Sequence, residues 1–127
     1  MNEDMKRKLA GSAWTLISFD TDTGVIAASQ QTPATLIFSA ADEQAGRLSG
    51  SGGCNRYFAS YTLTADRLQV RSLGATRMMC SPVQMEQEDR FFQALSTARR
   101  CEMSQDELLI AYAGGTLRFA PASELAG

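Results

Sequence analysis

Two cysteine-bearing segments in the middle of the chain most constrain its fold. They are Gly-Cys-Asn-Arg-Tyr at 53–57 and Thr-Arg-Met-Met-Cys at 76–80. A disulfide between Cys54 and Cys80 would stabilise the folded state by about 3–4 kcal/mol by restricting the unfolded chain. The alternative is a pair of free thiols, buried as small hydrophobic groups. An oxidising compartment favours the disulfide, and the cytosol favours the free thiols.

The residues around these cysteines do not indicate catalysis or metal binding. The chain has no histidine, which excludes Ser-His-Asp and Cys-His catalysis as well as histidine metal ligands. The third cysteine, Cys101, lies in an alternating run and is expected to be buried. Met78 and Met79 are adjacent and would point to opposite faces of a strand, so we expect core packing rather than a Cu(I) site. No enzyme activity, cofactor or metal is expected.

The composition predicts one ordinary globular domain. The chain has 127 residues, of which 44% are hydrophobic, and this is enough for one core. Its 12 basic and 14 acidic residues give a net charge of −2, which does not favour a nucleic-acid partner. The chain has no stretch approaching the ~18 apolar residues of a membrane span.

We divide the chain into a charged N-terminal arm at 1–8, a single domain at 9–120 and a C-terminal tail at 121–127. The arm is expected to be disordered. It lacks the apolar segment of a signal peptide. The protein is therefore expected either to be cytoplasmic or to have had a leader removed.

Alternation of apolar and polar residues predicts a mainly β structure. Trp14 and Phe19 are expected on opposite faces of their strand, and every second residue from Tyr57 is expected on one side of its own strand. Strands are expected at 14–19, 35–39, 57–63, 67–71, 108–112 and 116–119.

Three segments predict departures from regular strands. Residues 21–33 are interpreted as a polar connector. The run Arg-Leu-Ser-Gly-Ser-Gly-Gly at 47–53 would weaken a strand and permit close approach of another backbone. Gly114-Gly115 is typical of a two-residue hairpin turn.

The segment 82–98 predicts an amphipathic helix. Ser81 can cap it, Pro82 suits its first turn, and Gln84 completes a capping box. Apolar residues then recur at helical spacing, namely Phe91, Phe92, Leu95 and Ala98. We interpret the acidic residues Glu86, Glu88 and Asp89 as a solvated face. The predicted fold is a small antiparallel barrel or strongly curved sheet with one packed helix.

Three polar residues of the cysteine segments have ordinary interpretations. Asn55 is expected to bond nearby backbone in a turn, in preference to binding a ligand. Arg56 and Arg77 are expected either to pair with carboxylates or to be solvated.

The chain resembles the META-domain family of heat-inducible, HslJ-type bacterial proteins. The resemblance runs from about residue 9 to residue 119. Its most specific part is the two cysteine motifs, formed by Gly53, Cys54, Asn55, Arg56, Tyr57 and by Thr76, Arg77, Met78, Met79, Cys80. It implies a calycin-like β-barrel with a packed helix, an outer-membrane or periplasmic location, often as a lipoprotein, and a link to heat shock and novobiocin tolerance. The resemblance implies no catalytic residues.

We therefore expect a non-enzymatic, monomeric envelope protein that acts in stress tolerance by binding a protein partner or a small apolar ligand. One alternative is a lipocalin-like carrier, in which Trp14, Tyr57 and Tyr61 would face the ligand. Another is an inhibitor or adhesion module that presents the connector at 21–31. A hydrolase or redox enzyme is disfavoured because histidine and a C-x-x-C motif are missing.

Overall fold

The chain forms one antiparallel sheet that closes into a ring, with a helix packed on it. The computed structural model describes residues 9–42 and 44–122. Within them the strands are β1 (Ala13–Thr21), β2 (Gly24–Ala27), β3 (Thr35–Ala40), β4 (Ala45–Ser51), β5 (Arg56–Thr64), β6 (Arg67–Ala75), β7 (Arg100–Ser104), β8 (Glu107–Tyr112) and β9 (Gly115–Pro121). The predicted mainly β fold, with a strongly curved antiparallel sheet and one helix, is confirmed.

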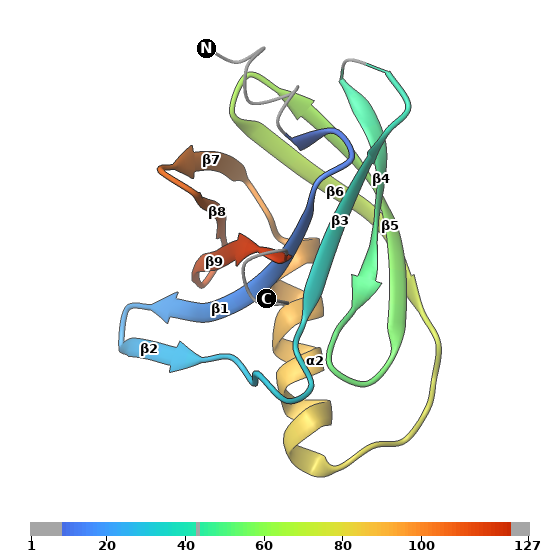
Figure 1. Cartoon of the computed structure of the whole chain (residues 1–127), viewed down its shortest axis with the longest axis vertical. Helices are drawn as coiled ribbons and strands as arrows, with labels where there is room; N and C mark the ends of the chain where they lie inside the picture. The colour runs from blue at the N-terminus through green and yellow to red at the C-terminus, as the bar shows by residue number, and fades with distance from the viewer. Residues whose placement is uncertain (1–8, 43, 123–127) are drawn as a thin grey trace.

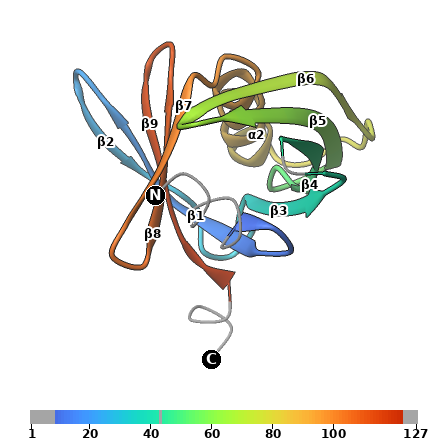
Figure 2. The same ribbon diagram turned by 90° about the horizontal axis from the view of Figure 1, so that it is seen from above.

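The strand order explains how the ring closes. The order is β2-β1-β3-β4-β5-β6-β7-β8-β9, and β9 also pairs with β1 (Figures 1 and 2). Most neighbours pair along several residues, but the described part of β6 and β7 shares the single register pair Arg67↔Arg100. Of the junctions between neighbouring strands of the ring, this one therefore has the fewest paired residues in the described part of the chain.

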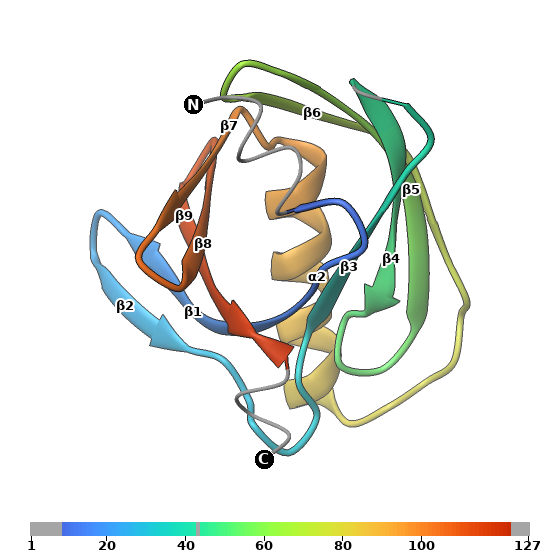
Figure 3. The ribbon, with the colours of Figure 1, turned by 45° about the horizontal axis from the view of Figure 1, so that its top comes forward.

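Helix α2 (Pro82–Ser96) packs on the interior of the ring (Figure 3). It buries Phe91 and Leu95 completely. The Phe91 ring lies edge-on to Tyr57 of β5 at 5.7 Å and to Phe119 of β9 at 6.2 Å, measured between centroids. The helix thus joins opposite parts of the sheet through one aromatic cluster.

The predicted capping box of α2 is present. Gln84 N donates to Ser81 Oγ at 3.3 Å, and Ser81 N donates to Gln84 Oε1 at 3.1 Å. The helix ends at Ser96, two residues before the predicted end at Ala98, and Thr97 caps it. The local sequence signals at the start of this helix were therefore sufficient to place it.

Strand β5 follows the predicted alternation along its whole length. Tyr57, Ala59, Tyr61 and Leu63 are buried, and the residues between them are exposed. In antiparallel sheets with one solvated face, this alternation sets the register.

Strand β1 departs from the predicted alternation. Its register with β9 shifts between Leu16 and Ser18, so Ile17 is an extra residue in β1. This bulge reverses the facing of the strand. Trp14 and Phe19 are consequently both buried in the core, and the expectation that they lie on opposite faces is wrong.

The predicted polar connector at 21–33 contains strand β2. This strand pairs with β1 up to Thr21↔Gly24 and lies outside the ring (Figure 2). All four of its residues are exposed. Its only large apolar residues, Val25 and Ile26, form a run too short to be recognised as a strand from the sequence.

The glycine-rich segments are more regular than predicted. Strand β4 extends through the run at 47–53 as far as Ser51. The predicted hairpin at residues 114–115 is present, but Tyr112 pairs with Gly115, so the two-residue loop is Ala113-Gly114.

The proposed ends of the domain lie largely outside the described residues. The arm at 1–8 and residues 123–127 fall there. Pro121, which we assigned to the tail, is the last residue of β9. No helix in the described ranges is long and apolar enough to cross a membrane.

Candidate functional site

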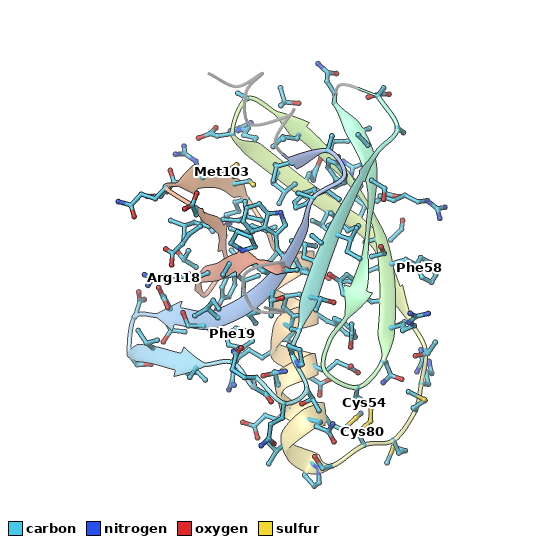
Figure 4. The ribbon with its side chains drawn as sticks, in the orientation of Figure 1. Phe19, Cys54, Phe58, Cys80, Met103 and Arg118 are labelled. Carbon is cyan, nitrogen blue, oxygen red and sulfur yellow. A yellow bond between two sulfur atoms is a disulfide. The ribbon has the colours of Figure 1, made fainter. Side chains whose placement is uncertain are left out.

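The structure brings the two cysteine segments together. Cys54, just before β5, and Cys80, just before α2, form a disulfide with their Cα atoms 6.1 Å apart (Figure 4). The disulfide, which was one of two alternatives from the sequence, is therefore confirmed. It fixes the start of the helix to the sheet.

Asn55 fastens the second cysteine segment to the first. Its Oδ1 accepts hydrogen bonds from Thr76 Oγ1 at 2.9 Å and from Met78 N at 2.6 Å. Its Nδ2 donates to Met78 O at 3.2 Å and to Glu88 Oε1 at 2.8 Å. The bonded backbone lies 23 positions away, so the expectation of a purely local turn was wrong.

Glu88 is a buried carboxylate, and its assignment to a solvated face was wrong. It is only 3% exposed, and its Oε2 accepts hydrogen bonds from the backbone N–H groups of Cys54 and Asn55. Charge-assisted bonds of this kind compensate for the burial of a carboxylate. The helical spacing of Glu88, Phe91 and Leu95 places them on one face of α2, and this was the sequence signal for its burial.

Two glycines allow the helix to approach this cluster. A Cβ atom on Gly52 would lie 2.6 Å from Glu88 Cγ and 2.8 Å from Phe92 Cε1. Gly53 has φ +114°, a conformation that side chains rarely allow. The prediction that the glycine run permits close approach is confirmed. We call Cys54, Asn55, Thr76, Met78 and Glu88 the Asn55–Glu88 cluster.

The two methionines of the second motif face solvent, and the expectation that they pack in the core was wrong. Met78 is 56% exposed and Met79 is 89% exposed. Both line a surface hollow of about 450 Å³ between the end of β6 and α2. Apolar side chains from both elements share it, namely Leu73, Met85 and Phe92, and we call it the methionine hollow.

The three aromatics proposed to face a ligand are buried. Trp14, Tyr57 and Tyr61 are 4%, 2% and 7% exposed and belong to the core. Trp14 Nε1 donates to Ser12 Oγ at 2.7 Å, and the Tyr57 hydroxyl donates to the Thr35 carbonyl at 2.6 Å. Burial raises the pKa of Tyr57. All three side chains pack within the hydrophobic core cluster, which counts against a ligand at these residues.

Cys101 is a buried free thiol, as predicted. Burial, with a smaller contribution from Glu102 and Asp66, raises the pKa of this thiol to about 12. A neutral thiol is a poor nucleophile and a poor metal ligand. The described ranges contain no group of three or more His, Cys, Asp or Glu side chains able to hold a metal.

The motif arginines are solvated. Arg56 and Arg77 are both exposed, and neither forms an ion pair with another described residue. Of the two alternatives for these arginines, solvation is therefore the one observed.

Comparison with known proteins places the chain in a family. The META domain model matches residues 7–124. An NMR structure of a protein from Burkholderia xenovorans is similar, with 28% identity over 95% of this chain and 88% of that chain and a TM-score of 0.76. A second NMR structure has 24% identity, covers 92% of this chain and 94% of its own, and has a TM-score of 0.70.

A more distant solved structure supports the fold, and the curated proteins contribute no match. The crystal structure of a DUF4847 family protein from Bacteroides vulgatus shares the fold alone, with 16% identity, coverage of 91% and 96%, and a TM-score of 0.57. None of the curated proteins matches. The cysteine motifs, the ring of strands and the match over almost the whole length agree: the chain belongs to the META domain family.

Proposed function

We propose that this chain is a non-enzymatic protein of the bacterial envelope that contributes to heat and antibiotic tolerance by binding an apolar ligand or partner. The observation that carries the proposal is the exposure of Met78 and Met79 beside a buried polar cluster. Large exposed apolar groups are typical of binding sites. Within the Asn55–Glu88 cluster, the Asn55 side chain bonds both the N–H and the carbonyl of Met78, so the cluster acts as a scaffold for a surface.

The methionine hollow has the chemistry of an adaptable binding site. Its methionine side chains are flexible and polarizable, and such side chains accommodate ligands of varied shape. Arg77 and Asp89 also line the hollow and supply polar groups beside its apolar side chains. A few polar groups within an apolar site provide orientation.

The disulfide supports the envelope setting. Structural disulfides persist in oxidising compartments such as the periplasm and are rare in cytosolic proteins. The bond joins two motif segments that also share the hydrogen bonds of Asn55, so it reinforces an arrangement that the polar contacts already favour.

A complementation experiment tests the binding surface. A bacterial strain that lacks its own META-domain protein is given the wild-type chain, the double variant Met78→Ser/Met79→Ser or the control Val83→Ser. Val83 is 77% exposed but does not line the methionine hollow. We expect the wild type and the control to restore growth under heat and novobiocin, and the double variant to fail at equal protein level.

Two results would contradict the proposal. The first is full complementation by the methionine variant. The second is turnover, in a broad activity screen, that is lost in Cys101→Ser. A count of free thiols on exported protein tests the proposed envelope location separately. One free thiol supports this location, and three free thiols in protein never exposed to reductant contradict it.

A second candidate function is a protein-binding module, which the exposed strand β2 favours. Its free edge could add a strand from a partner, as in other proteins that recognise extended segments. Val25 is 70% exposed on this strand. Ala28 N donates to Ile17 O of β1, so in the alternating strand the N–H of Ala27 faces the free edge. Ala27→Pro would remove that donor and leave the methionine hollow intact, so complementation by this variant separates the two functions.

A further inference from the structure

The outer face of strands β4–β6 carries a concentration of positive charge that the composition does not reveal. Arg47 of β4, Arg56 of β5, and Arg67 and Arg71 of β6 are all exposed. Arg47 and Arg71 lie opposite the same residue of β5, Ser60, from its two sides. We call these four side chains the arginine face.

Carboxylates are absent from the strands that carry this face. The sequences of β3, β4, β5 and β6 contain neither Asp nor Glu. The described acidic residues of this part of the chain, Asp42 and Asp66, belong to the connections. Asp42 accepts hydrogen bonds from backbone N–H groups, and Asp66 pairs with Arg100 at 3.9 Å.

The charge of the arginine face is therefore not neutralised by its described neighbours. None of its four arginines forms an ion pair with another described residue. The whole chain has a net charge of −2, so positive charge is segregated onto one side of the ring. Such segregation attracts an anionic partner.

Arg47 and Arg71 flank a hollow of about 320 Å³ on this side of the sheet. Ser60, Thr62 and Gln69 also line it and offer hydroxyl and amide donors. Arg71 is oriented by a hydrogen bond from its Nη2 to Gln69 Oε1 at 3.0 Å. The planar guanidinium group with parallel donors suits phosphate oxygens.

Phe58 adds an apolar group to the same face. It is 56% exposed and points away from the ring (Figure 4). The alternation of β5 puts it on the same face as Arg56 and Ser60. Gly74 of β6 makes room for its ring, because a Cβ there would lie 3.1 Å from Phe58 Cζ. An exposed aromatic side chain among arginines fits the interfacial layer of a bilayer, where phosphates lie beside acyl chains.

We propose that the arginine face binds the surface of an anionic phospholipid bilayer. The face is an open sheet surface with a single exposed large aromatic, whereas single-stranded nucleic acid takes a groove with successive stacking platforms. The choice of phospholipid over nucleic acid also rests on the envelope setting proposed above. The protein thus binds the membrane with one side, and the methionine hollow remains a separate site.

Vesicle sedimentation tests this proposal with the full, disulfide-bonded chain. The vesicles contain either equal parts of phosphatidylglycerol and phosphatidylcholine or phosphatidylcholine alone. We expect binding to the anionic vesicles that weakens as salt is raised, and little binding to the neutral ones. Each arginine near the surface contributes about fivefold to the partition coefficient, so Arg47→Gln/Arg71→Gln should lower it about 25-fold.

The matched control is Arg90→Gln/Arg118→Gln, which changes the net charge equally at one arginine of α2 and one of β9, outside strands β4–β6. We expect it to bind within about threefold of the wild type. Phe58→Ser supplies a second variant and should weaken binding without changing its salt dependence. Circular dichroism of every variant verifies the fold.

Three results would overturn the proposal: equal losses in the two double variants, equal binding to neutral and anionic vesicles, or tighter binding to a single-stranded DNA oligonucleotide than to the anionic vesicles at the same salt. Met78→Ser/Met79→Ser should bind vesicles like the wild type. Failure of vesicle binding would leave the complementation result standing, so the failures of the two proposals can be told apart.

Discussion

Asn55 and Glu88 form a buried polar pair, with Asn55 Nδ2 donating to Glu88 Oε1 at 2.8 Å. Each residue is 3% exposed. Through this pair the helix, the start of β5 and the second cysteine segment share one set of hydrogen bonds. Buried polar groups are costly when a partner is removed, so the pair gives the sharpest tests of the structure.

Replacing Glu88 with alanine should lower the free energy of unfolding by about 3–4 kcal/mol, because the N–H groups of Cys54 and Asn55 and the amide of Asn55 lose their acceptor. Glu88→Gln keeps one acceptor and should cost about 1–2 kcal/mol. Urea unfolding measures both values. Glu86→Ala is the control: Glu86 lies on the same helix in an exposed ion pair with Arg90 and should change stability by less than about 0.5 kcal/mol. Equal effects at the two positions would contradict the buried role of Glu88.

Removing the disulfide with Cys54→Ala/Cys80→Ala should lower the free energy of unfolding by about 3–4 kcal/mol, because the unfolded chain gains conformational freedom. Guanidinium unfolding with and without dithiothreitol measures this. The reductant should destabilise the wild type and Cys101→Ala, and should leave the double variant unchanged. A wild-type protein that is insensitive to the reductant after full reduction would show that the bond contributes no stability.

Gly52→Ala should destabilise the fold by about 2–3 kcal/mol, because the new Cβ would overlap Glu88 and Phe92 of the helix. Gly114→Ala is the comparison. A Cβ there would lie 3.2 Å from the ring of Tyr112 in an exposed hairpin loop, and the cost should stay below about 1 kcal/mol. Thermal unfolding of both variants shows which substitution lowers stability more. A larger loss of stability for Gly114→Ala would contradict the close approach of the helix at Gly52.

Cys101 makes stability fall at alkaline pH. Burial raises its pKa from 9.0 to about 12, so the folded thiol stays neutral while the unfolded thiol ionises. The stabilisation is complete below pH 9 and is lost as the pH rises towards 12, with a slope of up to about 1.4 kcal/mol per pH unit. Tyr57, whose pKa burial also raises, adds to the same fall above its ordinary range.

Cys101→Ala isolates the contribution of the thiol. Its unfolding free energy, followed by urea titration at several pH values, should decline less between pH 9 and pH 11 than that of the wild type. In the native protein, Cys101 should also react with iodoacetamide only as fast as the chain opens. Rapid alkylation of the folded wild type at neutral pH would contradict its burial.

The parts of the fold that were predictable are those set by local sequence. The alternation in β5 and the capping box at Ser81 depend on residues a few positions apart, and both were placed from the sequence. The bulge at Ile17 was not, because it depends on the register with β9. Strand β2 was missed because its pairing with β1 defines it.

The candidate site was predictable only in its covalent part. The pairing of Cys54 with Cys80 was one of two readings of the motifs. From the sequence we expected Glu88 to be exposed and Met79 to be buried, and the structure shows the opposite for both. Each outcome follows from where the second cysteine segment lies against α2. A helical projection with Phe91 would have placed Glu88 inward, but no local signal separates an exposed methionine from a buried one.

The junction between β6 and β7 is the part of the ring with the least backbone pairing among the described residues. Beside Arg67↔Arg100, the hydrogen bonds Leu68 N to Arg99 O and Cys101 N to Asp66 O complete the described backbone junction. Fewer backbone hydrogen bonds must break there than between β5 and β6, so local opening of the ring costs less free energy at the β6–β7 junction. The amides of Leu68 and Cys101 should therefore exchange with deuterium before those of β5. Local opening then takes place on the side of the molecule away from the disulfide.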